Sequence, residues 1–212
     1  QKFTCNYERI FYNTTRNIKN IISSHVFGEI QKISIVEGGL NGKTGITKNS
    51  YRNDPKISGG FLRDSAGHTF NQLNFLFENI SVNSVDIIWQ ENFDLESNIV
   101  FNVKEKNSFS IDYQGTQIKR VEPKITILFE KIKIEFNHQL PDSSFQISLL
   151  NSDKKFILKE ENHFASTFPQ AYYLKWKDFI NKISSSQLDP EFETSLSTTK
   201  LISDILQKDG KK

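Results

Sequence analysis

The chain has 212 residues, of which 36% are hydrophobic and 25% are charged, and it contains 18 phenylalanines. This composition is typical of a globular protein with a buried core and excludes a disordered chain. The 27 basic and 25 acidic residues leave a formal net charge of +2 and form no long block of one sign, so charge gives no support to nucleic-acid binding.

Cysteine content and apolar runs bear on the compartment. Cys5 is the only cysteine, so no disulfide can form within the chain, and we expect a reducing, cytoplasmic environment. No apolar run approaches the ~18 residues of a membrane span, and we expect no membrane partner. The chain begins with Gln1 and contains no methionine, so it is either a processed or excised fragment or its methionines are missing from the sequence as written.

Residues 9–25 carry apolar side chains at helical spacing, and Gly28 marks a stop after them. Alternation at Ile33 and Ile35 predicts a strand over residues 29–37. A glycine-rich loop is predicted over 38–60 and a further helix over 62–77, and loops of that length are usually functional or disordered.

From residue 82 to 160 the pattern changes to a period of two, which predicts strands of a largely antiparallel sheet. The alternating runs are 85–89, 99–103, 109–113, 125–129, 132–136 and 145–149. Two helices follow, beginning at Pro169 and Asp189, and the first has an apolar stripe of Tyr173, Trp176, Ile180 and Ile183. We therefore expect residues 1–212 to form a single α+β domain.

The segment most suited to chemistry lies at the start of the predicted helix 62–77. At 100° per residue, Asp64, His68 and Asn71 lie roughly opposite the apolar face of this helix. That apolar face consists of Leu62, Ala66, Phe70, Leu73, Leu76 and Phe77. The helix can therefore pack on the sheet while Asp64 and His68, one turn apart, face away from it.

A carboxylate beside an imidazole raises the basicity of the imidazole and fixes its orientation, which suits Asp64 and His68 to general acid/base work. Gly59 and Gly60, just before them, allow a substrate or another backbone to approach closely. An Asp-x3-His pair on an exposed helix face is also commonly idle. Its spacing would suit two metal ligands, but no third ligand is evident nearby, so we expect no metal. The other histidines, at positions 25, 138 and 163, are predicted to be surface or packing residues.

The pattern Gly59-Gly60-x3-Asp64-x3-His68-x2-Asn71 resembles the Gly-Gly-x3-Asp-x-Gly-x-His-x2-Asp signature of the glucose-fructose oxidoreductase/inositol dehydrogenase (Gfo/Idh/MocA) family. That signature belongs to the family's C-terminal domain. The segments 6–9, 27–30 and 54–58 and the two closing helices are similar to the family's order of elements, so the resemblance covers nearly the whole chain. It implies a largely antiparallel open sheet with helices packed on one face, like that of dihydrodipicolinate reductase.

Several positions depart from the family pattern. Ala66 stands where the family has glycine, and Asn71 replaces the last aspartate. Arg63 adds a charge at a position that is often apolar, which suits either an anionic substrate or plain solvent exposure. The family's N-terminal Rossmann domain, with its Gly-x-Gly-x2-Gly and Glu-Lys-Pro segments, has no counterpart in these 212 residues. We therefore expect NAD or NADP to be bound mainly by a domain outside this chain, and the chain alone to be inactive.

The resemblance implies an NAD(P)-dependent oxidoreductase that acts on a hydroxyl or keto group of a sugar, polyol or sugar derivative. His68 would be the acid/base and Asp64 would orient it. Weaker candidates for substrate contact are Arg9, Tyr51, Arg52 and Arg63. The resemblance also implies a homo-oligomer through the sheet face.

Two alternatives remain open. One is a non-catalytic ligand-binding relative, against which the intact Asp64 and His68 count. The other is a dimerisation module that uses the open sheet face, against which a polar outward face would count.

Overall fold

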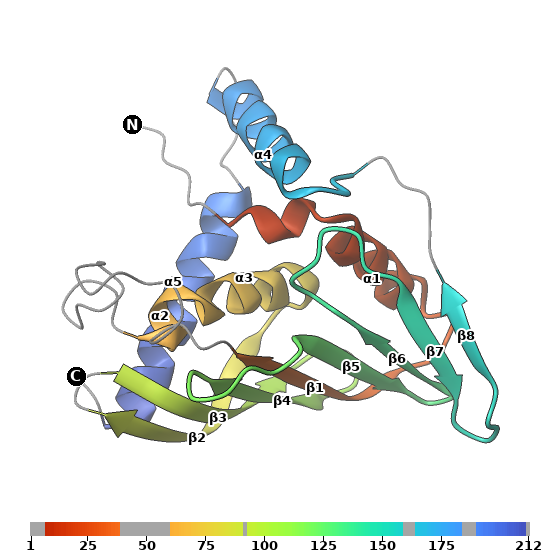
Figure 1. The fold of residues 1–212 in the computed structure, drawn as a ribbon, viewed down its shortest axis with the longest axis horizontal. Coiled ribbons are helices and arrows are strands. Elements are labelled where there is room, and N and C mark those ends of the chain that lie inside the picture. Colours follow the sequence, from red (N-terminus) through yellow and green to blue (C-terminus); the bar gives the residue numbers. More distant parts are fainter. Residues whose placement is uncertain (1–6, 39–59, 91–92, 159–163, 184–189, 211–212) are drawn as a thin grey trace.

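The computed structural model describes residues 7–38, 60–90, 93–158, 164–183 and 190–210, and its centre is an eight-stranded sheet (Figure 1). The strand order is β2-β3-β4-β1-β5-β6-β7-β8. Among the described strands, only β1 and β4 pair in parallel. The strands are β1 (Ile30–Gly38), β2 (Ile80–Gln90), β3 (Phe93–Val103), β4 (Phe109–Thr116), β5 (Lys124–Phe129), β6 (Ile132–Phe136), β7 (Phe145–Leu149) and β8 (Lys155–Leu158).

The helices gather on one side of this sheet, and α4 lies farthest from it (Figure 1). They are a 3₁₀ turn η1 (Glu8–Phe11), α1 (Asn13–Ser24), α2 (Phe61–Asp64), α3 (Ala66–Leu76), α4 (Phe168–Ile183) and α5 (Pro190–Lys208). In the described part of the chain, no helix combines the length and apolar character needed to cross a membrane. The predicted α+β class, with a largely antiparallel sheet and helices on one face, is confirmed.

The core lies between the helix layer and the inward face of the sheet. Period-two alternation places Ile33 and Ile35 of β1 on this face, where both are almost fully buried. Phe70 of α3 is fully buried, and its ring meets Phe101 of β3 at 5.6 Å and Tyr113 of β4 at 5.0 Å, edge-on in both cases. These contacts fix α3 on β3 and β4.

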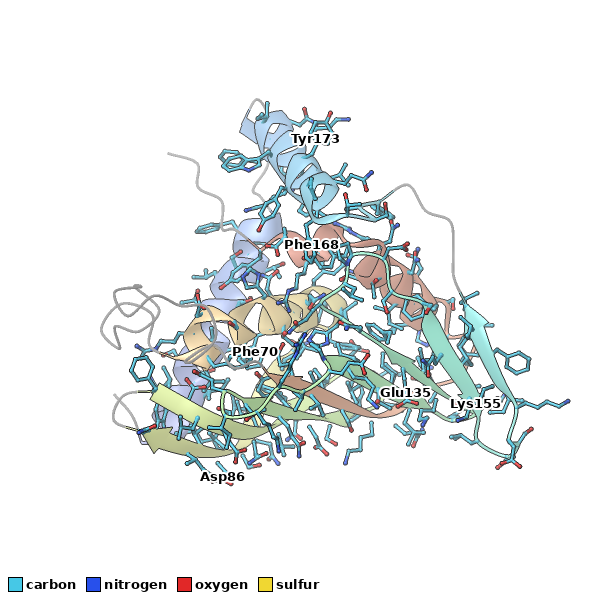
Figure 2. All side chains as sticks on the ribbon, in the orientation of Figure 1. Phe70, Asp86, Glu135, Lys155, Phe168 and Tyr173 are labelled. Atoms are coloured by element: carbon cyan, nitrogen blue, oxygen red, sulfur yellow. The ribbon has the colours of Figure 1, made fainter. Side chains whose placement is uncertain are left out.

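The outward face of the sheet is largely polar. In Figure 2, Asp86 and Glu135 point away from the helix layer. Lys32 pairs with Asp112 at 2.5 Å and Lys124 pairs with Glu135 at 3.1 Å on this face. The outward side chains of the four central strands are Lys32, Ser34, Val36, Glu96, Asn98, Val100, Asn102, Ser110, Asp112, Gln114, Lys124, Thr126 and Leu128.

The predicted helix 9–25 is wrong in one respect, because it is divided at Tyr12 into η1 and α1. Tyr12 has an extended backbone (φ −64°, ψ 140°) and forms a β-bridge with Ala165. The Asn13 N–H donates to the Ala165 carbonyl at 3.0 Å, and the Ala165 N–H donates to the Phe11 carbonyl at 3.2 Å. These long-range bonds interrupt a sequence whose local pattern favours an unbroken helix.

Three further predictions change in detail. The helix 62–77 is divided at Ser65 into α2 and α3, and strand β8 was not predicted. The apolar stripe of α4 is exposed rather than buried, with 64% of Tyr173, 50% of Trp176 and 60% of Ile180 open to solvent. The predicted start of the last helix at Asp189 lies outside the described residues.

The core contact of α3 gives a stability prediction. Phe70→Ala should lower the free energy of unfolding by about 3–5 kcal/mol, because it removes a fully buried ring and leaves a cavity. Tyr173→Ala, which truncates an exposed ring (Figure 2), should change it by no more than about 0.5 kcal/mol. Urea unfolding followed by circular dichroism measures both, and equal losses would contradict this account of the core.

Candidate functional site

The η1 turn and the first turn of α3 bring His68 next to two charged side chains. The Nδ1 atom of His68 lies 3.5 Å from Oε2 of Glu8, whose side chain is 8% exposed. The Tyr7 ring stands edge-on to the imidazole at 5.4 Å between centroids. Arg9 donates from Nη1 to Oγ1 of Thr69, the residue after His68, at 3.1 Å. The arrangement leaves 28% of the His68 side chain exposed, so a ligand can reach the ring.

The environment of His68 favours the neutral imidazole. Burial lowers the pKa of His68, and the nearby Arg9 guanidinium lowers it further. The carboxylates of Glu8, Asp64 and Glu37 raise the pKa but do not outweigh these two effects. A neutral imidazole can accept a proton, which is what a general base requires.

Asp64 lies one turn before His68, as predicted, but on the other side of the break at Ser65. It is half-buried at the end of α2, and Ser65 Oγ donates to its Oδ2 at 3.5 Å. The Glu8 carboxylate lies within ion-pair distance of His68, and Asp64 raises the His68 pKa less than Glu8 does. Asp64 therefore influences His68 through its charge.

Behind His68, the buried carboxylate of Glu37 organises the inner wall of the site. Glu37 follows Ile33 and Ile35 on the inward face of β1 and is fully buried. Its oxygens accept hydrogen bonds from Thr69 Oγ1 at 2.7 Å, Tyr113 Oη at 2.8 Å and Gln139 Nε2 at 2.9 Å. The structure thus joins α3, β4 and the loop after β6 through one side chain of β1.

His138 completes this cluster, with Nε2 3.2 Å from Glu37 Oε2. Burial by itself would raise the pKa of Glu37, but the bonds from His138 and Thr69 and the Arg9 charge outweigh it and lower the pKa to about 2. Burial lowers the pKa of His138. We conclude that Glu37 is ionised and His138 is neutral and donates to it, because Glu37 has three other donors.

A second buried carboxylate fixes the start of α2. Gly60 has φ +94° and its backbone lies against Asp94, so any Cβ there would collide with Asp94 Oδ1. The Leu62 N–H donates to both carboxyl oxygens of Asp94, at 3.2 and 3.4 Å, and Ser97 Oγ donates at 3.4 Å. Burial raises the pKa of Asp94 to about 7, against the lowering effect of these bonds. The glycine pair was predicted to allow a substrate or another backbone to approach closely. At Gly60, the group that lies close is the carboxyl group of Asp94 on β3.

The other predicted site residues are dispersed. Arg63 is exposed, and Asn71 is buried, where it donates to Thr198 Oγ1 of α5 at 3.3 Å. Asn71, which was predicted to lie roughly opposite the apolar face of the helix, therefore binds a neighbouring helix. Tyr51, Arg52 and Gly59 lie outside the described residues.

Sequence reasoning gave no role to Glu8, Glu37 or His138. Two signals were present: Glu8 stands beside Arg9, and Glu37 continues the inward alternation of Ile33 and Ile35. His138 was predicted to be a surface or packing residue, and its burial fits the second of these. No local pattern marks its contact with Glu37, 101 residues away.

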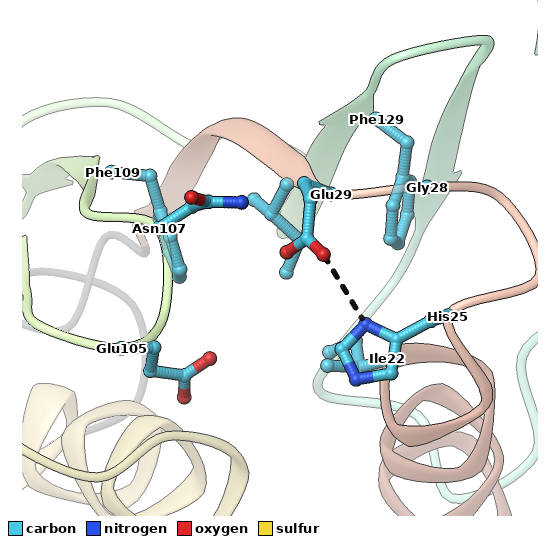
Figure 3. A pocket seen from close by; sticks show the side chains of 9 residues that line it. Ile22, His25, Gly28, Glu29, Glu105, Asn107, Phe109 and Phe129 are labelled. Carbon is cyan, nitrogen blue, oxygen red and sulfur yellow. Dashed lines mark ion pairs between the residues drawn. The ribbon is translucent and has the colours of Figure 1, made fainter.

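Two other kinds of site are relevant in the described part of the chain, a metal site and a small pocket away from His68. Among the residues that the structure describes, no group of three or more His, Cys, Asp or Glu side chains could hold a metal ion. Figure 3 shows a small pocket near His25, whose Nδ1 lies 3.8 Å from Glu29 Oε1. It has room for about one water molecule and lies at the opposite end of β1 from Glu37.

Comparison with known proteins agrees with this fold. Residues 15–135 match the model of the GFO/IDH/MocA C-terminal domain, and the chain belongs to this family. No curated protein matches the chain.

Solved structures that share the fold are oxidoreductases. Levoglucosan dehydrogenase, in complex with NADH and levoglucosan, has a TM-score of 0.76 at 13% identity, over 97% of this chain and 64% of that one. A 3-ketoreductase from Actinomadura kijaniata, solved with NADP and TDP-benzene, has a TM-score of 0.76 at 11% identity, over 97% of this chain and 62% of that one. An NAD binding oxidoreductase from Klebsiella pneumoniae has a TM-score of 0.73 at 15% identity, over 95% of this chain and 62% of that one. The chain thus spans less than two thirds of the length of these proteins.

The Glu37 cluster makes a pH-dependent prediction. The pKa of about 2 in the folded state lies below the ordinary 4.5, so the ionised carboxylate stabilises the fold above pH 4.5, and this contribution is lost as the pH falls towards 2. Glu37→Gln should lower the free energy of unfolding by about 3 kcal/mol at pH 7 and by much less at pH 3. Glu135→Gln on the outward face should lower it by about 1 kcal/mol or less. Urea unfolding at both pH values tests this, and a loss that does not depend on pH would contradict it.

Asp94 predicts the opposite dependence. Its folded pKa of about 7 lies above the ordinary 3.8, so folding favours the protonated acid, and that stabilisation is lost as the pH rises from 3.8 through 7. Asp94→Asn should therefore gain stability relative to the natural chain between pH 5 and pH 8, by about 1–3 kcal/mol. Asp86→Asn, on the exposed outward face, serves as the matched control. A constant difference between Asp94→Asn and the natural chain over this range would count against the buried acid.

Proposed function

We propose that this chain is the substrate-binding and catalytic C-terminal half of an NAD(P)-dependent oxidoreductase that acts on a hydroxyl or keto group of a sugar, polyol or sugar derivative. The observation that carries the proposal is the state of His68. Its ring is partly exposed, its pKa is lowered mainly by burial, and Nδ1 faces a buried carboxylate. Membership of the Gfo/Idh/MocA family supports the reaction class.

The start of α2 does not suit the phosphates of a dinucleotide. Gly60 introduces α2, but the N–H of Leu62 already donates to the carboxyl group of Asp94, so this helix start is occupied. The whole sequence also contains no Gly-x-Gly-x2-Gly. Hydride transfer would be the chemistry of a cofactor held mainly by another domain, and the role of this chain would be to bind the substrate and move its proton.

His68 would accept the proton of a substrate hydroxyl during oxidation and return it during reduction. Arg9 is positioned beside it by Thr69 and keeps the resting imidazole neutral. Asp64 and Glu8 would stabilise the imidazolium once the proton has been taken, because both carboxylates favour the charged form. The same residues would thus serve before and after proton transfer.

Levoglucosan and TDP-benzene in the solved relatives support, for this chain, a sugar or a sugar derivative as substrate. The homo-oligomer through the sheet face remains a prediction. The outward face is largely polar and carries ion pairs such as Lys32–Asp112. Covering that face would remove water from charged groups, which weakens the alternative of a dedicated dimerisation module.

Asparagine substitution at two histidines tests the acid/base role. In the full-length gene product, His68→Asn should lower kcat for the NAD(P)-dependent oxidation of a responsive sugar or polyol by about 10²–10⁴-fold, because the proton acceptor is lost. His25→Asn is the matched control, since His25 is exposed and its positive φ of 51° suits asparagine.

The measurement is initial-rate kinetics on a panel of aldoses, polyols and sugar acids with both nicotinamide cofactors. If the full-length His68→Asn variant oxidises a panel member as fast as the natural protein does, the acid/base role of His68 is wrong. Absence of turnover with every panel member and both cofactors would favour the non-catalytic, ligand-binding alternative.

A further inference from the structure

Two buried polar atoms face one another at the edge of the site. Among the described residues, neither Nδ1 of His68 nor Oε2 of Glu8 has a hydrogen-bond partner, and each is shielded from solvent. They lie 3.5 Å apart. Buried polar groups are nearly always paired, so a small rotation of either side chain that closes this distance would satisfy both.

We propose that Glu8 is a positioning residue that accepts a hydrogen bond from Nδ1–H of His68 and thereby holds the neutral imidazole in the tautomer whose Nε2 is free to accept a proton. The assignment follows from the chemistry of the two groups. An ionised carboxylate only accepts hydrogen bonds, so the proton between them belongs to Nδ1. Nδ1 is buried, so solvent or substrate reaches the ring through its other atoms.

Glu8 is itself held on the opposite side. Tyr12 Oη donates to its other oxygen, Oε1, at 3.2 Å. Tyr12 is fully buried, and its backbone is fixed by the bridge to Ala165. The break between η1 and α1 therefore has a consequence for the site, because it turns Glu8 towards α3 and sets the position of its carboxylate.

The surrounding charges identify which carboxylate matters. Arg9 on η1, Asp64 on α2 and Glu37 on β1 all influence His68, but Glu8 is the carboxylate with the largest effect. Glu37 is already engaged by Thr69, Tyr113 and Gln139. The tautomer role is thus assigned to Glu8 rather than to Asp64. Its importance for catalysis rests on the proposed function, whereas the tautomer itself does not.

Nitrogen-15 NMR of the imidazoles in this chain tests the proposal without substrate or cofactor. Long-range proton–nitrogen correlations show which nitrogen of neutral His68 carries the proton, and His68→Asn assigns its signals. We expect Nδ1 to be protonated in the natural chain. In Glu8→Gln the amide can either accept or donate, so we expect a mixture of tautomers and titration of His68 at lower pH, because the negative charge is gone.

Asp64→Asn is the matched control and should leave the tautomer unchanged while shifting the titration less than Glu8→Gln does. If Glu8→Gln fails to fold, Tyr12→Phe removes only the hydroxyl that holds Glu8 and should shift the tautomer in the same direction. An Nε2–H tautomer in the natural chain would overturn the proposal. So would an unchanged tautomer in Glu8→Gln or, if that variant does not fold, in Tyr12→Phe.

Kinetics of the full-length protein separate this inference from the proposed function. Glu8→Gln should lower kcat about 10–100-fold with little change in KM, and shift the pH profile in the direction of the His68 titration. If NMR confirms the Nδ1–H tautomer but the full-length protein is inactive, the role of Glu8 stands and the proposed oxidoreductase function fails. If the full-length protein is active but His68 keeps its tautomer in Glu8→Gln, the proposed function stands and the role of Glu8 fails.

Discussion

The fold around the site depends on one buried negative charge, that of Glu37. A carboxylate removed from water must be fully hydrogen-bonded, and the donors come from three elements that are distant in sequence. Thr69 supplies the shortest of these bonds, at 2.7 Å, and at the same time accepts one from Arg9. Because His68 directly precedes Thr69, the charge on β1 determines where the imidazole stands and which charges surround it.

The segment that carries Asp64 and His68 is held at both ends by carboxylates with opposite properties. At its start, Asp94 binds the Leu62 N–H, and burial raises the pKa of this acid to about 7. At its end, Glu37 binds Thr69 and keeps a pKa of about 2 because its donors outweigh its burial. Both groups are buried, so the difference lies in the kind of neighbour. The pKa of Glu37 is lowered by His138, by the Arg9 charge and by Thr69, whereas the groups that lower the pKa of Asp94 are backbone N–H groups and Ser97. Near neutral pH, only the contact at the start of the segment is sensitive to protonation.

Much of the fold could be predicted because local patterns determine it. Alternation at Ile33 and Ile35 identified β1, and the helical apolar face at Phe70 identified the side of α3 that packs on the sheet. The site could be predicted only in part. His68 lies within a local motif, but its partner Glu8 is brought to it by the β-bridge between Tyr12 and Ala165, which no local pattern encodes. Contacts of this kind come from packing between distant segments and override helix propensity.

The geometry separates two tasks that an oxidoreductase of this class must perform. Phosphate binding requires free backbone N–H groups and positive potential, whereas the start of α2 is already occupied by Asp94. Proton transfer requires a partly exposed base that is neutral before the reaction. Burial and the Arg9 charge lower the pKa of His68 and outweigh the three carboxylates around it, so they favour this neutral form. On the same balance, replacing any one of these charges should shift the pKa of His68 without removing the base. In the proposed function, the sheet domain would contribute proton chemistry and substrate contacts.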